Sequence, residues 1–163
     1  MIINIKNKDT LIVDLFEFKC SIGKNGFTSN KREGDNKTPK GTYSIGNLYY
    51  RKDRNLNLET SLKKIPIKKN MAWCDDVNSK KYNKRIKINK KVSYEKLYRR
   101  DHNYDLLIPI NYNMNPIIKN EGSAIFIHLT ENYKKTQGCI ALLKKDFLIL
   151  LKIINSKTKI KIG

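Results

Sequence analysis

Apolar residues occur along this chain in short runs, separated by polar stretches rich in Lys and Asn. In the first 50 residues, three runs (residues 2–5, 10–20 and 41–50) alternate apolar with polar side chains, the second only imperfectly. Alternation with a period of two is typical of strands that bury one face. Residues 104–112 and 123–128 carry unbroken apolar runs with Ile and Phe, which favours strands at the centre of a sheet.

Two segments predict helices, and only the second of them has a clear helical period. Residues 93–100 favour a short helix, with Ser93 as its N-cap. Residues 157–163 alternate again and predict a final strand. The clear helix is expected over residues 143–154, whose apolar face is formed by Leu143, Phe147, Leu150, Leu151 and Ile154.

These elements predict a mainly β fold with mixed sheets or a β-sandwich and one or two short helices. A chain of 163 residues is long enough to bury one core, and no internal repeat or low-complexity linker divides it. We therefore expect a single domain over residues 1–163. Residues 29–45 have the Gly, Pro, Asn and Asp content of a loop that leads into a strand, and residues 51–70 predict no element.

The charge of the chain is strongly positive. Lys and Arg number 34 against 15 Asp and Glu, which gives a net charge of +19. Six of the basic residues are Arg, so 34 − 6 = 28 are Lys. The abundance of Lys, Asn and Ile fits the codon bias of an AT-rich genome with a solvated surface, and the alternative is an anionic partner such as a nucleic acid, a membrane surface or the cell wall. Specific readers of nucleic acid favour Arg and interleaved aromatic residues, so no specific nucleic acid is expected.

The sequence contains no transmembrane segment and no signal-peptide pattern. Its longest apolar run, residues 147–154, includes Lys152 and is far shorter than the roughly 20 residues that span a bilayer. The three cysteines, Cys20, Cys74 and Cys139, form no disulfide framework and show no zinc-ligand spacing. At least one thiol is therefore free unless two chains pair.

One His and one of these Cys residues form a candidate catalytic couple. His128 ends the run of residues 123–128, and Cys139 follows eleven positions later, directly after Gly138. A thiolate attacks carbonyl groups while an imidazole manages the protons, and backbone N–H groups beside a Gly can stabilise an oxyanion. Spacing alone leaves the alternative open that His128 is a core histidine and Cys139 an inert buried thiol.

The residues around this pair resemble the L,D-transpeptidase catalytic domain, also called the YkuD-like family. The family pattern is a His, a loop, and then Ser/Thr-x-Gly-Cys followed by an apolar residue, which here reads His128 and TQGCI (136–140). Four segments in family order, from about residue 20 to residue 152, are far more specific than the pair alone. KREGDNKTPKGTYSI (31–45) resembles the upstream segment of the family, and AWCDDVNSKKYN (72–83) and YEKLYRRDHNYDLLIPINYN (94–113) resemble the middle of a compact bacterial subgroup.

The resemblance implies peptidoglycan stem peptides as donor and acceptor, with no metal and no organic cofactor. Cys139 would attack the carbonyl of the third stem residue, a diamino acid, and release the terminal D-alanine. An amine of a second stem would then take the acyl group and form a 3→3 cross-link. Water as the acceptor would give L,D-carboxypeptidase activity, and a D-amino acid would give exchange. His128 would be the base, oriented by the backbone carbonyl of Leu129, and the N–H groups of Gly138 and Cys139 would form the oxyanion hole. Carbapenem-type inhibitors would acylate Cys139.

Two arginines are candidates for binding a carboxylate of the stem peptide. Arg32 would do so from the KREGD segment through its guanidinium group, and its alternative is a salt bridge within the loop to Asp35 or Glu33. Arg99 would act in the same way from the LYRRDH segment, and its alternative is a solvated surface position.

Four further residues are candidate contacts in the site. His102 would line it, or serve as a hydrogen-bonded structural histidine. Trp73 would form a wall of the cleft, or simply pack in the core. Thr136 would support the turn before the nucleophile. Gln137 stands where many family members have a second His, and it can orient a substrate but cannot titrate.

A rival hypothesis is a non-catalytic module whose positive surface holds nucleic acid or a cell-wall polymer. The location of the protein is open. The implied substrate points to the periplasm or cell envelope, whereas the lack of a visible signal after Met1 leaves the cytoplasm possible.

Overall fold

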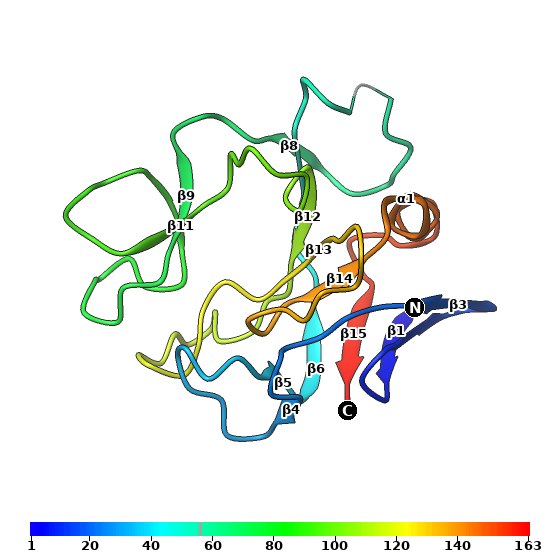
Figure 1. The fold of residues 1–163 in the computed structure, drawn as a ribbon, viewed down its shortest axis with the longest axis horizontal. Helices are drawn as coiled ribbons and strands as arrows, with labels where there is room; N and C mark the ends of the chain where they lie inside the picture. Colours follow the sequence, from blue (N-terminus) through cyan, green and yellow to red (C-terminus); the bar gives the residue numbers. More distant parts are fainter. Residues whose placement is uncertain (56) are drawn as a thin grey trace.

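The first sheet brings the two ends of the chain together. The computed structural model describes residues 1–55 and 57–163 (Figure 1). Its parallel pair of β1 (Ile2–Lys6) and β15 (Lys159–Ile162) lies at the centre of a five-stranded sheet. The sheet has the order β3-β2-β1-β15-β6, completed by β2 (Thr10–Val13), β3 (Phe16–Lys19) and β6 (Gly41–Ser44). Alternate residues of β1, β2 and β15 are buried on one face, as the period of two predicts.

The imperfect alternation of residues 10–20 has a structural cause. The segment is an antiparallel hairpin of β2 and β3, and its turn includes Asp14 with a φ of +53°. Asp tolerates this left-handed backbone better than most residues. Leu15, beside it, is 94% exposed, so an apolar residue here marks the turn and not the core. Similarly, residues 41–50 split into two strands that belong to different sheets.

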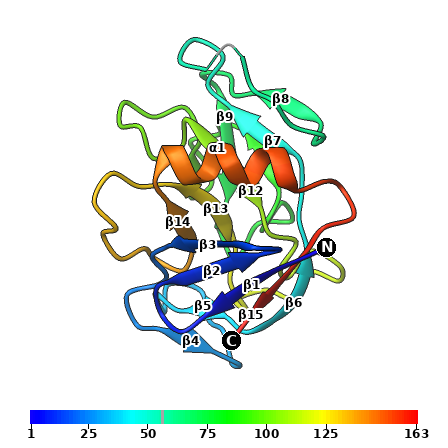
Figure 2. The ribbon, with the colours of Figure 1, turned by 90° about the vertical axis from the view of Figure 1, so that its right-hand side faces the viewer.

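The second sheet lies between the two hydrophobic clusters of the molecule. Its order is β14-β13-β12-β7-β8, formed by β14 (Ile140–Leu142), β13 (Phe126–Leu129), β12 (Leu106–Pro109), β7 (Leu48–Tyr50) and β8 (Lys64–Pro66). The single helix of the described residues, α1 (Lys144–Ile153), follows β14 directly and lies across these strands (Figure 2). It buries Phe147, Leu150 and Leu151 against them, as its helical period predicts.

The two faces of this second sheet serve different parts of the molecule. Ile127 and Leu129 of β13 point into the main core, which α1 and the first sheet complete. Phe126, on the opposite face, packs in a second cluster with Leu107 and Trp73. A central strand buried on both faces appears in the sequence as a continuous apolar run, which is why residues 123–128 predict a strand without a period of two.

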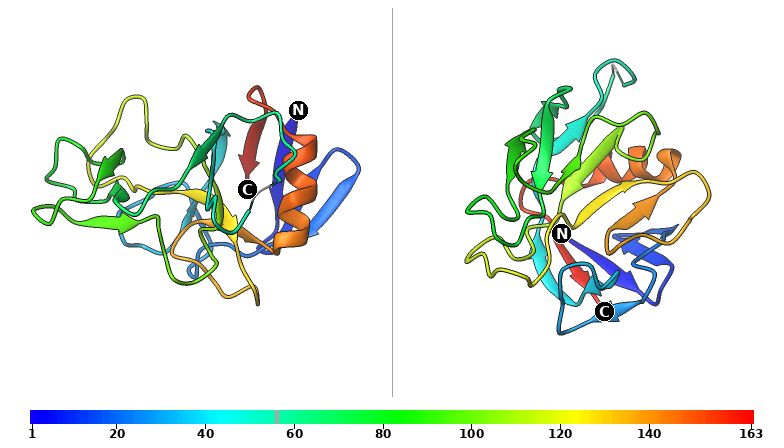
Figure 3. Two further views of the ribbon diagram at one scale, coloured as in Figure 1. Left: turned by 90° about the horizontal axis from the view of Figure 1, so that it is seen from above. Right: turned by 60° about the vertical axis from the view of Figure 1, so that its left-hand side comes forward.

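A small three-stranded sheet stands at the end of the molecule away from α1 (Figure 3). Its order is β10-β9-β11, formed by β10 (Arg85–Lys87), β9 (Met71–Cys74) and β11 (Tyr94–Lys96). The expected helix over residues 93–100 is therefore wrong. Tyr94 pairs with Cys74 in an antiparallel ladder, and Leu97 is fully buried beyond it. Pairing with β9 thus overrides a weak local helix preference.

Two very short strands, β4 (Phe27–Thr28) and β5 (Thr38–Pro39), pair in parallel, the first just before the predicted loop of residues 29–45 and the second within it. The mainly β fold with one short helix confirms the expected fold class. In the part of the chain that the structure describes, no helix has the length and apolar character needed to cross a bilayer.

Candidate active site

His128 and Cys139 line the same cleft, which has a volume of about 470 Å³. The β13–β14 register explains why. The strands run in parallel with His128 opposite Ala141, and Cys139 stands two residues before Ala141. Because side chains alternate along a strand, Cys139 and Ala141 share the face that His128 occupies. The eleven-residue excursion therefore returns the thiol to the imidazole's side of the sheet.

The His128 ring is fixed by its own strand and by one neighbour. Its Nδ1 lies 2.8 Å from the carbonyl oxygen of Leu129, and the Tyr104 ring meets it edge-on at 5.1 Å between centroids. A carbonyl oxygen only accepts hydrogen bonds, so Nδ1 carries the proton of the neutral ring. Nε2 then holds the lone pair, which is the form that can accept a proton.

The thiol is held in the backbone of the neighbouring strand. Cys139 is 8% exposed; its Sγ lies 3.2 Å from the carbonyl oxygen of Ala124 and accepts a bond from the N–H of Phe126 at 3.3 Å. Burial raises the pKa of Cys139 and lowers the pKa of His128 to about 4. At neutral pH the resting pair is therefore a thiol beside a neutral imidazole, and not a preformed ion pair.

The turn before Cys139 depends on Gly138. Its φ of +138° lies in the region that favours glycine, and an added Cβ would stand 2.8 Å from the carbonyl oxygen of Lys37. Thr38, in the predicted loop, donates from Oγ1 to the Gly138 carbonyl at 2.8 Å. The loop of residues 29–45 and the nucleophile turn are thus held together across 100 residues of sequence.

Thr136 ties both ends of the same turn. Its Oγ1 accepts the Gly138 N–H at 3.1 Å and donates to the Cys139 carbonyl at 2.6 Å. The N–H of Gly138, one of the two expected oxyanion donors, is therefore already engaged. In residues 1–55 and 57–163 no side chain accepts from the N–H of Cys139, which leaves it the freer donor. Gln137, which lies between Thr136 and Gly138 in the sequence, is exposed and lines the cleft.

Arg99 lies on the wall of the cleft, where a carboxylate could reach it. Its guanidinium binds both carboxylate oxygens of Asp101, and it stacks over the Tyr104 ring at 4.9 Å. Arg51 reaches across from the end of β7, donates to the Arg99 carbonyl at 2.7 Å and forms a two-point pair with Asp53. The irregular segment that carries Arg99 is thus fixed by side chains, and not by a ladder.

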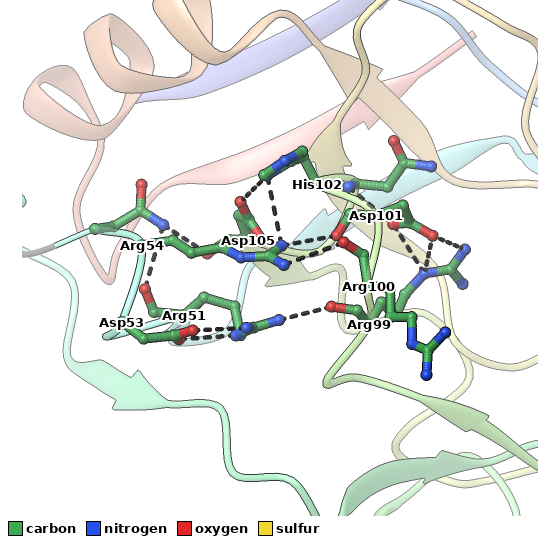
Figure 4. A network of polar contacts seen from close by, with 10 residues as sticks. Arg51, Asp53, Arg54, Arg99, Arg100, Asp101, His102 and Asp105 are labelled. Carbon is green, nitrogen blue, oxygen red and sulfur yellow. Dashed lines mark hydrogen bonds and ion pairs between the residues drawn. The ribbon is translucent and has the colours of Figure 1, made fainter.

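Arg54 holds the same segment as Arg51 (Figure 4). We call the contacts that Arg51 and Arg54 make with residues 99–105 the clamp. Its Nη1 donates to Asp105 Oδ1 at 2.7 Å and to the Asp101 carbonyl at 2.9 Å, while Nη2 donates to the Arg100 carbonyl at 3.1 Å. Asp105 is 3% exposed, and its two carboxylate oxygens contact Arg54 and His102. Together, Arg51 and Arg54 satisfy three successive carbonyl groups, those of residues 99–101.

Four of the expected site residues lie outside the cleft lining, namely Gly138, whose turn is described above, His102, Trp73 and Arg32. His102 belongs to the clamp, with its Nδ1 at 2.7 Å from Asp105 Oδ2. Trp73 is buried beneath the cleft, where its Nε1 donates to Asn83 at 3.0 Å and its ring meets Phe126 edge-on. The Arg32 side chain is exposed, and among the described residues it pairs with neither Asp35 nor Glu33.

Sequence reasoning missed the charged residues that surround the thiol. Lys31, and not Arg32, pairs with Asp35, at 2.5 Å, and it lines the cleft. Glu33 accepts from Tyr82 at 2.5 Å and from Ser123 at 2.7 Å.

Two more carboxylates, Asp75 and Glu95, come from the small sheet and line the cleft. The hydroxyl of Tyr104 donates to Glu95, and burial raises the pKa of Glu95. Their place in the sequence could have indicated these four residues, because the segments that carry the family resemblance contain Lys31, Glu33, Asp75 and Glu95. Among the described residues, no group of three or more His, Cys, Asp or Glu side chains could hold a metal ion.

Comparison with known families agrees with this fold. The sequence pattern of the YkuD family, described as the L,D-transpeptidase catalytic domain, matches residues 1–162. The chain therefore belongs to the YkuD family of L,D-transpeptidase catalytic domains. No curated protein matches the chain.

Proposed function

We propose that this protein is a cysteine-dependent L,D-transpeptidase that acts on peptidoglycan tetrapeptide stems. Family membership supports the class of reaction. The observation that carries the assignment to particular residues is the shared face of His128 and Cys139 in one cleft, with the His128 lone pair free at Nε2.

The first half-reaction forms a thioester. Nε2 of His128 accepts the thiol proton as Sγ of Cys139 attacks the carbonyl of the third stem residue. The N–H of Cys139 donates to the oxyanion, joined by the N–H of Gly138 when that N–H divides its hydrogen bond between Thr136 Oγ1 and the oxyanion. Collapse breaks the amide bond, and the protonated His128 returns its proton to the nitrogen of the departing D-alanine.

The second half-reaction consumes the thioester. An amine of a second stem attacks its carbonyl, His128 accepts the proton of that amine, and the Cys139 thiolate leaves and is reprotonated. Water in the place of the amine yields hydrolysis, and a free D-amino acid yields exchange. Among the other candidates, Arg99 would bind a substrate carboxylate through the guanidinium edge that Asp101 does not occupy.

The test is incubation with purified tetrapeptide-stem muropeptides, followed by mass spectrometry of the products. We expect Cys139→Ala and His128→Ala each to abolish D-alanine release, whereas Cys20→Ala, which removes another buried thiol, keeps it. A carbapenem should add its mass to the wild type and to Cys20→Ala but not to Cys139→Ala. D-alanine release by Cys139→Ala would contradict the mechanism, and the ratio of cross-linked to tripeptide product separates transfer from hydrolysis.

A further inference from the structure

A second hollow lies on the small three-stranded sheet, away from His128 and Cys139. Three cationic side chains, Lys81, Arg85 and Lys87, surround it, and Ile86 and Val92 give it an apolar floor. Two of the cations belong to β10, which is an edge strand of its sheet. We call the exposed cations of residues 80–91 the basic patch: Lys80, Lys81, Lys84, Arg85, Lys87, Lys90 and Lys91.

The basic patch concentrates charge beyond the average of the chain. Seven of the twelve residues from 80 to 91 are Lys or Arg, and the nearest acidic residues in sequence are Asp76 and Glu95. In the part of the chain that the structure describes, none of the seven forms an ion pair. By contrast, Arg54 and Arg99 are each paired with a carboxylate. The field of the basic patch is therefore not neutralised by the protein itself.

The same run of sequence is fixed to the wall of the cleft. Tyr82, between Lys81 and Lys84, turns inward and donates to Glu33. Asn83 accepts the N–H of Ala124 at 3.1 Å, and the carbonyl of Ala124 lies 3.2 Å from the Cys139 Sγ. The basic patch is thus tied through two buried residues to the strand segment that holds the nucleophile.

We propose that the basic patch is a docking surface for a polymer with closely spaced carboxylates, namely the peptide stems of intact peptidoglycan. The proposal rests on the proposed function and extends it from one stem to the polymer that carries many stems. Six of the seven cations are Lys, which bind as point charges and tolerate many carboxylate geometries. The only aromatic ring of the run, Tyr82, is 2% exposed, so no base could stack there, which argues against single-stranded nucleic acid.

The experiment compares two triple variants in the inactive Cys139→Ala background. The first carries Lys81→Gln, Arg85→Gln and Lys87→Gln. The control carries Lys6→Gln, Lys159→Gln and Lys161→Gln, which removes the same charge from exposed positions of the first sheet. Binding is measured by cosedimentation with purified, insoluble peptidoglycan over a range of salt concentrations, and circular dichroism checks that each variant is folded.

We expect the first triple to bind the insoluble peptidoglycan at least tenfold more weakly than its parent, and the control triple less than twofold more weakly. Equal weakening in both triples would overturn the proposal, because net charge alone would then explain binding. Tighter binding to duplex DNA or to anionic phospholipid vesicles than to peptidoglycan at the same salt would assign the basic patch to another partner.

A second measurement separates this proposal from the proposed function. With Cys139 restored, the first triple should turn over soluble muropeptides as the wild type does and lose rate only on intact peptidoglycan. An equal loss on both substrates would overturn the docking role, because the variant would then have damaged the cleft. Absence of turnover in the wild type would overturn the proposed function and leave the binding comparison valid.

Discussion

The hydroxyl of Thr136 makes two hydrogen bonds within the turn that carries the thiol. One hydroxyl closes the turn before Cys139 from both ends, through Gly138 and through the Cys139 carbonyl. A Ser can make the same two bonds, whereas a Val has nearly the same shape and can make neither.

We predict that Thr136→Val lowers the free energy of unfolding by about 1–2 kcal/mol, because two partners lose their bonds. It should also slow D-alanine release, because the Cys139 N–H is no longer held in place, whereas Thr136→Ser keeps both properties near wild type. Urea unfolding and steady-state kinetics measure the two effects. Equal turnover in the Val and Ser variants would mean that the hydroxyl does not position the oxyanion donor.

At the residue scale, the sequence pointed to His128 and Cys139 as a pair but not to the carboxylates that line the same cleft. Cys139 and His128 stand out because their motif is contiguous and chemically specific. Glu33 and Glu95 do not, because a carboxylate at a cleft has the same local sequence signature as one in solvent. Their importance arises only when tertiary pairing brings Tyr82 and Tyr104 to them.

At the scale of elements, the segment of residues 99–105 is the most dependent on side chains. It carries Arg99 and Tyr104 to the cleft, yet the guanidinium groups of Arg51 and Arg54 hold its successive carbonyls. A Lys ammonium is a compact donor group that cannot span a carboxylate and two carbonyl groups in one plane.

Replacement of Arg54 by Lys should therefore loosen residues 99–105, which carry Arg99 to the cleft, and leave Cys139 in place. We predict a fall in the free energy of unfolding of about 1–3 kcal/mol and a rise in KM that exceeds any change in kcat. The matched control is Lys52→Gln, an exposed neighbour without an ion pair among the described residues. Kinetics on muropeptides give the split between KM and kcat, and a fall in kcat alone would contradict the positioning role.

Element prediction succeeded where local pattern and tertiary context agree. The helix over residues 143–154 and the strand over 157–163 form close to their expected bounds, because each has a strong period, whereas the strand expected over 123–128 begins only at Phe126. The helix over residues 93–100 failed because β9 offers Tyr94 a ladder that no local pattern reveals. The clamp was equally hidden, since Arg51 and Arg99 are 48 residues apart.

At the scale of the whole molecule, burial of an uncharged His128 makes stability depend on pH. Its pKa is about 4 in the folded protein and 6.5 for the unperturbed side chain. Between these values the unfolded chain binds a proton that the folded chain does not, so stability falls as the pH falls. A shift of this size corresponds to about 3 kcal/mol between pH 7 and pH 4.

We therefore predict that the wild type loses about 3 kcal/mol more unfolding free energy over this range than His128→Asn does. Urea titrations at pH 7 and pH 4 measure the difference, and carboxylates common to both proteins cancel in the comparison. The turnover rate should also fall below about pH 4, because a protonated imidazole cannot accept the thiol proton. Identical pH dependence of stability in the two proteins would contradict a buried neutral His128.

The four residues of β13 send alternate side chains to opposite sides of the central sheet. Ile127 and Leu129 belong to the main core, whereas Phe126 packs in the second cluster and His128 lines the cleft. The strand that carries the imidazole is therefore held by apolar packing on both of its faces, so the position of His128 depends on the two hydrophobic clusters together.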